Sequence, residues 1–249
     1  MIGAFIIARL DSTRLPKKAI MEILDKPMIE LMVERVKNSQ LVDKVVIATS
    51  RDASNDPLEK LANKMKIGCY RGSLENVMER ITEASNAFGC NTIVELLGDN
   101  PLVHSDLIDD VIRLYIAGQY DYAVTVTREY SLFASEKKHF SVGVRVQVYS
   151  GDVAGQYVDF PAYINNEDKH PSAYIYEHPK SFNLGYLEAK GKWTFLNKPD
   201  LNFAVNYRKN FDFVRAVFER HYHVDKNFSL QMVVEQLENE GHLYSLLGG

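Results

Sequence analysis

The chain has 249 residues, of which 46% are hydrophobic and 25% charged, as in an ordinary globular protein. A net charge of −4 argues against a general nucleic-acid-binding protein, which would carry a basic excess. Cys69 and Cys90 lack the spacing of metal ligands, so neither a zinc site nor a disulfide framework is indicated. Because no apolar stretch has spanning length and no signal peptide is visible, we expect a cytoplasmic protein without membrane insertion.

The first 126 residues alternate between patterns typical of strands and of helices. Residues 2–8 form an apolar run without polar alternation, which predicts a strand buried on both faces, as in a parallel sheet. Further strands are predicted over 44–49, 67–70, 92–97 and 122–126, and helices over 27–37, 57–65, 74–88 and 105–116. This alternation predicts an α/β fold with a Rossmann-like, mostly parallel, doubly wound sheet flanked by helices.

From about Arg128 the pattern changes to that of a mixed α+β lobe. Strands are predicted over 142–149, 182–189 and 201–205, the end of a helix over 174–177, and two closing helices over 210–220 and 230–239. No long linker separates the halves, so we expect a single domain over 1–249. Residues 127–249 would form a lobe that completes the site and an oligomer surface.

A basic loop follows the first predicted strand and lies beyond its carboxyl end. In an open α/β sheet, this edge is where ligands bind. Arginine pairs with phosphate oxygens in a bidentate manner and lysine acts as a point charge, so the loop suits a polyphosphate. The alternative is a surface loop that happens to be basic. Its cations and hydroxyls are Arg9, Arg14, Lys17, Lys18, Ser12 and Thr13.

Asp99 follows the predicted strand over 92–97, which places its carboxylate on the same edge. A carboxylate among phosphate-binding cations commonly serves Mg²⁺, which takes one or two carboxylates together with substrate phosphates. Gly98 would allow close backbone approach. The alternative is an aspartate that only forms a turn.

Arg71, Gly72 and Ser73 end a third predicted strand on that edge. Gly72 would let a flat ligand approach the backbone, and Ser73 could cap a helix that begins near Leu74. The cap alone would explain Ser73. Three strand ends that converge on one crevice nevertheless favour a nucleotide site.

Residues 8–18 resemble the amino-terminal motif of cytidylyltransferases that make CMP-activated acidic sugars, including the ketodeoxyoctulosonate-activating enzymes. Later segments fit the spore-coat polysaccharide branch of that family. These are residues 26–28, 45–50, 71–73, 98–102 and 173–179, and the resemblance runs from residue 1 to about residue 220.

The resemblance implies a fold of the nucleotide-diphospho-sugar transferase type and transfer of CMP from CTP to an acidic sugar or related small anionic acceptor. Pyrophosphate is released, and the product serves surface polysaccharide biosynthesis. Arg9, Arg14 and Lys18 would act on the triphosphate, and Asp99 would ligate Mg²⁺ with Asn206 at the place of a second ligand. A homodimer is also expected, with residues 1–126 as the nucleotide-binding half and residues 127–249 as the half for the acceptor and for oligomer contacts. The nucleotide-binding set would be Ala8, Ser12, Arg71, Gly72, Ser73, Asn76 and Gly98.

The chain departs from the family pattern at several positions. Lys17 and Asp25 stand where relatives have glycine, and Asn76 stands where an acidic residue is usual. Two carboxylates of a later motif are replaced by Arg145 and Gln147, and the second metal-binding aspartate is replaced by Asn206. Either the acceptor differs, with Arg145 pairing its anionic group, or catalysis has weakened and the fold is kept for nucleotide binding.

His170 and Tyr174 are candidates for the acceptor side, the alternative for His170 being a buried structural histidine. A third class of function is a metal-dependent glycosyltransferase, but its paired Asp-x-Asp is absent, since 98–100 supplies one carboxylate. Aromatic residues near His170 could stack on a sugar, although such clusters are more often core or dimer surface. They are Tyr157, Phe160, Tyr163, Tyr174 and Tyr176.

Overall fold

The computed structural model describes residues 1–129, 137–156, 158 and 172–247. The predictions made for His170, Tyr157, Phe160 and Tyr163 fall outside these ranges. Within the described residues, no helix is both long and apolar enough to cross a membrane.

One seven-stranded sheet organises the molecule, in the order β5-β4-β1-β6-β8-β7-β9. Neighbouring strands are parallel except at β8, which runs antiparallel to both β6 and β7. The predicted mostly parallel sheet is therefore confirmed. The strands are β1 (Ile2–Ile7), β4 (Lys44–Ser50), β5 (Gly68–Gly72), β6 (Thr92–Leu97), β7 (Tyr122–Thr125), β8 (Gln147–Ser150) and β9 (Leu184–Leu187).

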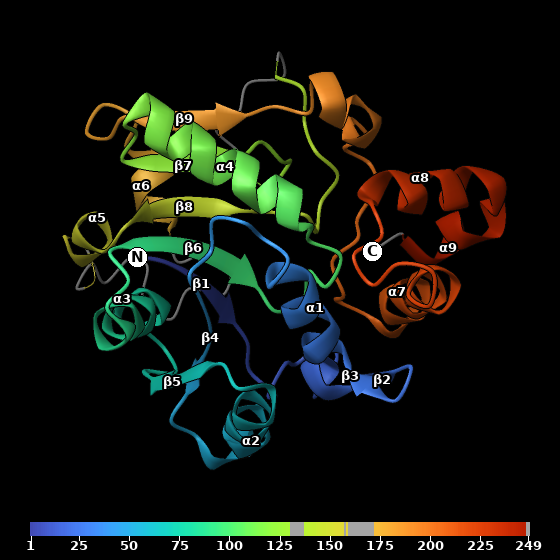
Figure 1. Cartoon of the computed structure of the whole chain (residues 1–249), viewed down its shortest axis with the longest axis horizontal. Coiled ribbons are helices and arrows are strands. Elements are labelled where there is room, and N and C mark those ends of the chain that lie inside the picture. The colour runs from blue at the N-terminus through green and yellow to red at the C-terminus, as the bar shows by residue number, and fades with distance from the viewer. Residues whose placement is uncertain (130–136, 157, 159–171, 248–249) are drawn as a thin grey trace.

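Helices cover both faces of this sheet (Figure 1), as a doubly wound fold requires. The larger core cluster takes apolar side chains from α1, α2, α4, α7 and α8, and the smaller one from α3, α5 and α6. The helices are α1 (Met28–Val36), α2 (Asp56–Met65), α3 (Val77–Phe88), α4 (Ser105–Gly118), α5 (Gly151–Gly155), α6 (Ala173–Glu177), α7 (Arg208–His221), α8 (Leu230–Asn239) and α9 (Tyr244–Leu247).

The strand register aligns the ends that carry the predicted site. Ile7 of β1 is paired with Ala48 of β4 on one side and with Leu97 of β6 on the other. On the next pair of strands, Ser50 of β4 is opposite Gly72 of β5. Because these strands are parallel, the loops that follow them leave the sheet at the same edge.

Two elements of the second half differ from the prediction. The strand expected over 142–149 is shortened to β8, and residues 201–205 form no strand. Instead, Val142 and Asn202 form an isolated bridge, in which the amides of Val142 and Phe203 donate to the carbonyls of Leu201 and Val142 at 2.9 and 2.8 Å. A single bridge satisfies these backbone groups, so the apolar segment is buried without extending the sheet.

A small hairpin, β2 (Glu22–Ile23) paired with β3 (Lys26–Pro27), precedes α1. Its two turn residues, Leu24 and Asp25, have φ of 52° and 58°. Positive φ at both central positions defines the type I′ turn, which favours Asn-Gly. Asp25, which departs from the glycine of the family pattern, therefore occupies a left-handed turn position.

The predicted start of α3 was wrong. The helix begins at Val77, and its cap is Asn76, whose side chain accepts from the amide of Glu79 at 2.9 Å. Ser73 instead accepts from the amide of Asn76 at 3.1 Å, inside the preceding loop. Asparagine caps a helix as well as serine does, and Asn76 rather than the predicted Ser73 is the cap used.

Candidate active site

Close contact between β1 and β6 brings the basic loop beside Asp99. The amide of Gly98 donates to the carbonyl of Ile7 at 2.9 Å, and the loop continues from buried Ala8. A Cβ on Gly98 would lie 2.9 Å both from Ile7 O and from the Ala8 Cβ. Any side chain would push the two strand ends apart, so Gly98 is needed for this contact.

Lys18 connects the basic loop after β1 to Asp99 and to the segment that precedes α7. It begins the short 3₁₀ helix η1 (Lys18–Ile20) and is largely buried. Its Nζ lies 2.8 Å from Asp99 Oδ2 and donates to the carbonyl of Val205 at 2.7 Å. The lysine predicted to act on the triphosphate is thus also the counter-ion of the predicted metal ligand.

The other two predicted cations of the loop are accessible from solvent. The side chain of Arg9 is 41% exposed and its Nε lies 3.5 Å from Asp11 Oδ1. Arg14 is exposed as well. Between them, Ser12 Oγ accepts from the amide of Leu15 at 3.5 Å, a long contact. Arg9 and Arg14 therefore lie where a soluble polyanion can reach them.

Asp99 and Asn206 each present an oxygen that fits a hard cation. The amide of Val205 donates to the Asp99 carbonyl at 2.8 Å, which places Asn206 next to this strand end. Asp99 Oδ1 and Asn206 Oδ1 are both buried and have no hydrogen-bond partner within the described ranges. Carboxylate and amide oxygens are the ligands that Mg²⁺ takes alongside phosphates. In the same ranges, no group of three or more His, Cys, Asp or Glu side chains could hold a metal alone.

The side chain of Arg71 contacts α2. Its Nη2 lies 2.7 Å from Asp56 Oδ1 and its Nη1 lies 2.9 Å from Glu59 Oε2. Hydrogen bonds to Glu59 and Asp56 raise the pKa of Arg71 above its usual value. Its guanidinium therefore fixes α2 against β5, and contact with a nucleotide base stays a prediction.

Gly72 and Ser73 both contact Arg80, a residue that the sequence did not single out. A Cβ on Gly72 would lie 2.8 Å from Arg80 Cγ, and Arg80 Nη1 donates to the Ser73 carbonyl at 3.0 Å. The glycine thus makes room for an arginine, whereas the sequence suggested room for a ligand. No signal for Arg80 was present in the sequence, because it lies in the second turn of the predicted helix over 74–88 and in the first turn only of the observed α3.

Asn76 is buried and occupied by structural contacts. Besides capping α3, its Nδ2 donates to the carbonyl of Val158 at 2.6 Å. The departure from an acidic residue therefore supplies an amide donor that a carboxylate lacks. Its role in binding a nucleotide stays a prediction.

Arg145 and Gln147 lie in a buried polar network on the face of the sheet covered by α3 and α6. The side chain of Arg145 is 0% exposed and its Nη1 lies 3.6 Å from Glu129 Oε1. Gln147 Nε2 donates to Glu95 Oε1 at 2.8 Å, and Tyr149 donates to Glu95 Oε2 at 2.7 Å. Burial raises the pKa of Glu95 despite these donors and the nearby charge of Arg145. Arg145 thus has protein carboxylates around it, and its contact with an anionic acceptor stays a prediction.

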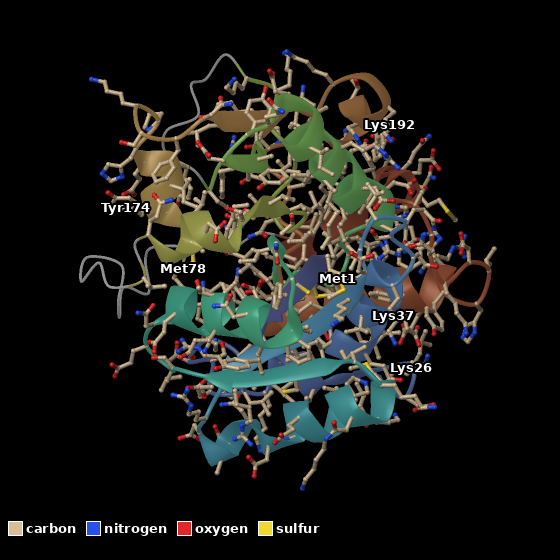
Figure 2. All side chains as sticks on the ribbon, turned by 60° about the vertical axis from the view of Figure 1, so that its left-hand side comes forward. Met1, Lys26, Lys37, Met78, Tyr174 and Lys192 are labelled. Atoms are coloured by element: carbon tan, nitrogen blue, oxygen red, sulfur yellow. The ribbon has the colours of Figure 1, made fainter. Side chains whose placement is uncertain are left out.

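Tyr174 lies on α6, on the same face of the sheet as Met78 of α3, and Figure 2 labels both side chains. Its ring stacks on His178 with centroids 4.1 Å apart and meets Phe182 edge-on at 6.1 Å. The aromatic group is therefore partly a packing cluster. Its use as a platform for a sugar stays a prediction.

Comparison with known proteins decides the family. A model of the family described as cytidylyltransferase matches residues 4–239, nearly the whole chain. The chain belongs to the cytidylyltransferase family. Members of this family are CTP-dependent nucleotidyltransferases, so the resemblance inferred from residues 8–18 is confirmed.

Two relatives match both branches named from the sequence. The spore coat polysaccharide biosynthesis protein SpsF of Bacillus subtilis is 27% identical over 87% of this cytidylyltransferase and 86% of its own length. The 3-deoxy-manno-octulosonate cytidylyltransferase of Geobacter sulfurreducens is 33% identical, over 45% of this chain and 44% of its own length.

Solved structures confirm the fold. A cytidylyltransferase from Leptospira borgpetersenii superposes with a TM-score of 0.83 at 21% identity, covering 97% of this chain and 95% of its own. A CMP:2-keto-3-deoxy-manno-octonic acid synthetase complexed with CTP superposes with a TM-score of 0.62 at 16% identity, covering 88% and 98%. At these identities, the likeness supports the arrangement of strands and helices alone.

Proposed function

We propose that this cytidylyltransferase transfers CMP from CTP to an acidic sugar or a similar small anionic acceptor, and that the product serves surface polysaccharide biosynthesis. The observation that carries the proposal is the junction of Lys18, Asp99 and Val205 at the edge where β1 and β6 end. Arg9 and Arg14 lie on the same loop and reach solvent. The name of the Geobacter relative supports an acidic-sugar acceptor, and the name of the Bacillus relative supports a role in polysaccharide biosynthesis.

In the proposed reaction, an oxygen of the acceptor attacks the α-phosphorus of CTP. A new P–O bond forms, the bond to the β-phosphate oxygen breaks, and pyrophosphate leaves on the opposite side. Such transfers need charge neutralisation and positioning more than covalent help. Arg9 and Arg14 would hold the triphosphate, and Lys18 would neutralise charge that develops on the leaving pyrophosphate.

We further propose that Asp99 and Asn206 hold Mg²⁺ through the two buried oxygens that lack hydrogen-bond partners within the described ranges. When bound, the ion would withdraw negative charge from the phosphates. Since Asn206 contributes no charge, Asp99 and the nucleotide would supply the negative ligands. In the absence of the ion, Lys18 would pair with Asp99 and stabilise this partly buried carboxylate.

Pyrophosphate release from CTP tests the proposal, measured with a panel of acidic sugars. We expect release with at least one acceptor, and a loss of about 10²-fold or more in kcat/KM for Arg14→Ala and for Asp99→Asn, as for removal of one transition-state charge contact. Arg113→Ala is the matched control, because Arg113 is an exposed arginine on α4 that pairs with Asp110. Unchanged turnover in both site variants would contradict the site.

One observation favours a second candidate, a nucleotide-binding protein with weakened catalysis. The ammonium of Lys18 already lies against Asp99, and the second ligand position is the uncharged Asn206. Both features reduce the affinity of the site for a divalent cation. CTP binding with no pyrophosphate release from any acceptor in the panel would favour this candidate.

A further inference from the structure

Arg80 is a buried arginine at the edge of the sheet from which the loops after β1 and β5 both leave. It lies in the first turn of α3 and is only 1% exposed. The bare backbone of Gly72 makes room for its stem, and the Ser73 carbonyl fixes its Nη1. Its Nε is buried and has no hydrogen-bond partner among the residues described. The guanidinium is thus held in place by one nitrogen, while another has no acceptor.

A cation is disfavoured at this position for three separate reasons. The amino-terminal end of α3 carries partial positive charge, which repels a cation in its first turn. Burial removes water from the guanidinium. The charge of Arg9 also repels the guanidinium. Burial, and to a smaller extent Arg9, lower the pKa of Arg80 to about 10, while the carboxylate of Asp11 raises it. Asp11 is itself close to Arg9, so one exposed carboxylate faces two cations.

A second buried arginine shows what a purely structural arrangement looks like. Arg35 of α1 donates through Nε and Nη2 to the carbonyls of Val103 and Leu102 at 3.1 and 3.3 Å. Its Nη1, like Arg80 Nε, is buried and has no hydrogen-bond partner among the residues described, so the two arginines differ in their other contacts. Its guanidinium lies over the ring of Phe228, 4.3 Å from the centroid, and Asp225 adds a favourable charge. Arg80 instead donates to one backbone carbonyl, that of Ser73, and the charge of Arg9 acts on it unfavourably. Packing alone therefore explains Arg35 better than it explains Arg80.

We propose that Arg80 binds a phosphate group of the nucleotide, together with Arg9, at the junction of the first loop and α3. The inference rests on the proposed function, because it assigns one more residue to the same nucleotide site. A phosphate here would give both arginines a counter-charge and would accept from Nε, while Nη1 stays on Ser73. The planar guanidinium suits phosphate oxygens, and the end of α3 favours an anion.

The test compares binding of CTP and of cytidine, which has the same base and ribose but no phosphate. Affinities of wild-type protein and of Arg80→Met are measured by displacement calorimetry, with MgCl₂ throughout. We expect Arg80→Met to weaken CTP binding by about tenfold to a hundredfold, the effect of losing one charged hydrogen bond, and to leave cytidine binding unchanged. Arg35→Met is the matched control, for which we expect lower stability and an unchanged ratio of the two affinities.

Each outcome decides between a phosphate contact and a supporting role. Equal losses for CTP and cytidine would show that Arg80 only shapes the loop, and no loss for either would also overturn the inference. Arg80→Gln keeps a donor for Ser73 without the charge; if Arg80→Met does not fold, the glutamine variant decides by the same ratio. Absence of CTP binding to the wild-type protein would overturn the proposed function and this inference together.

Discussion

Lys17 adopts a backbone conformation that glycine reaches more easily. Its φ of 58° and ψ of 19° lie in the left-handed region, and its amide donates to the Leu10 carbonyl at 2.9 Å. The family motif that residues 8–18 resemble has glycine at this place. In this chain lysine stands there with a left-handed backbone, and Asp25 likewise has φ 58°. Both departures therefore add local strain.

We expect Lys17→Gly to stabilise the protein by about 1 kcal/mol, because the side chain no longer crowds a left-handed backbone. Urea unfolding measures the difference. Lys17→Ala is the control, since it removes the same charge but keeps a Cβ, and it should give no such gain. A Lys17→Gly variant no more stable than Lys17→Ala would show that the loop tolerates lysine without strain.

The residues of the candidate site were predictable to the extent that strand order determines them. Lys18 and Asp99 were assigned from the ends of two parallel strands, and register does bring those ends together. Arg80 was missed because its surroundings depend on Gly72 and Arg9, which only the folded chain places beside it. Arg145 looked available for an acceptor because the sequence does not show that Glu129 and Glu95 lie around it.

At the scale of elements, β6 and β8 share a buried ionisable group. Glu95 of β6 is opposite Gln147 of β8, and burial raises the pKa of its carboxyl group. A carboxyl group with a raised pKa binds more protons in the folded than in the unfolded protein. Its contribution to stability is therefore greatest below the unfolded pKa and declines as the pH rises toward the folded pKa.

We expect Glu95→Gln to gain stability relative to wild type as the pH rises above about 4, the ordinary pKa of a glutamate, by at most about 1.4 kcal/mol per pH unit. Glutamine does not ionise, so the variant does not lose the free energy of unfolding that the wild type loses when buried Glu95 becomes charged. Urea unfolding at several pH values measures the difference. Glu235→Gln, on the exposed face of α8, is the control for charge. A pH-independent difference between Glu95→Gln and wild type would mean that Glu95 does not titrate as inferred.

The elements were predicted best in the first half of the chain, where strands and helices alternate. The strand pattern over 92–97 coincides with β6, because a buried parallel strand has a simple apolar signature. β8 was harder to place, since it comes after β7 in sequence yet lies between β6 and β7, antiparallel to both. The segment 201–205 has the apolar composition of a strand but is buried through a single bridge.

At the scale of the whole molecule, the candidate site lies between distant parts of the chain. Lys18 comes from the first half and holds the carbonyl of Val205, which lies just before α7. Figure 1 shows α7, α8 and α9 grouped together at one side of the sheet. A ligand bound to Lys18, Asp99 and Asn206 would therefore contact both halves and should stabilise the chain as a whole.

We expect CTP to raise the melting temperature more than the other nucleoside triphosphates, and to raise it further when Mg²⁺ is present. A ligand that binds only the folded protein stabilises it by an amount that grows with its concentration relative to its Kd. Asp99→Asn should keep a CTP effect through Arg9 and Arg14 but lose the added effect of Mg²⁺. A thermal-shift titration of both proteins measures this. A CTP effect indifferent to Mg²⁺ in the wild-type protein would show that Lys18 satisfies Asp99 in place of a metal, and would favour nucleotide binding with weakened catalysis.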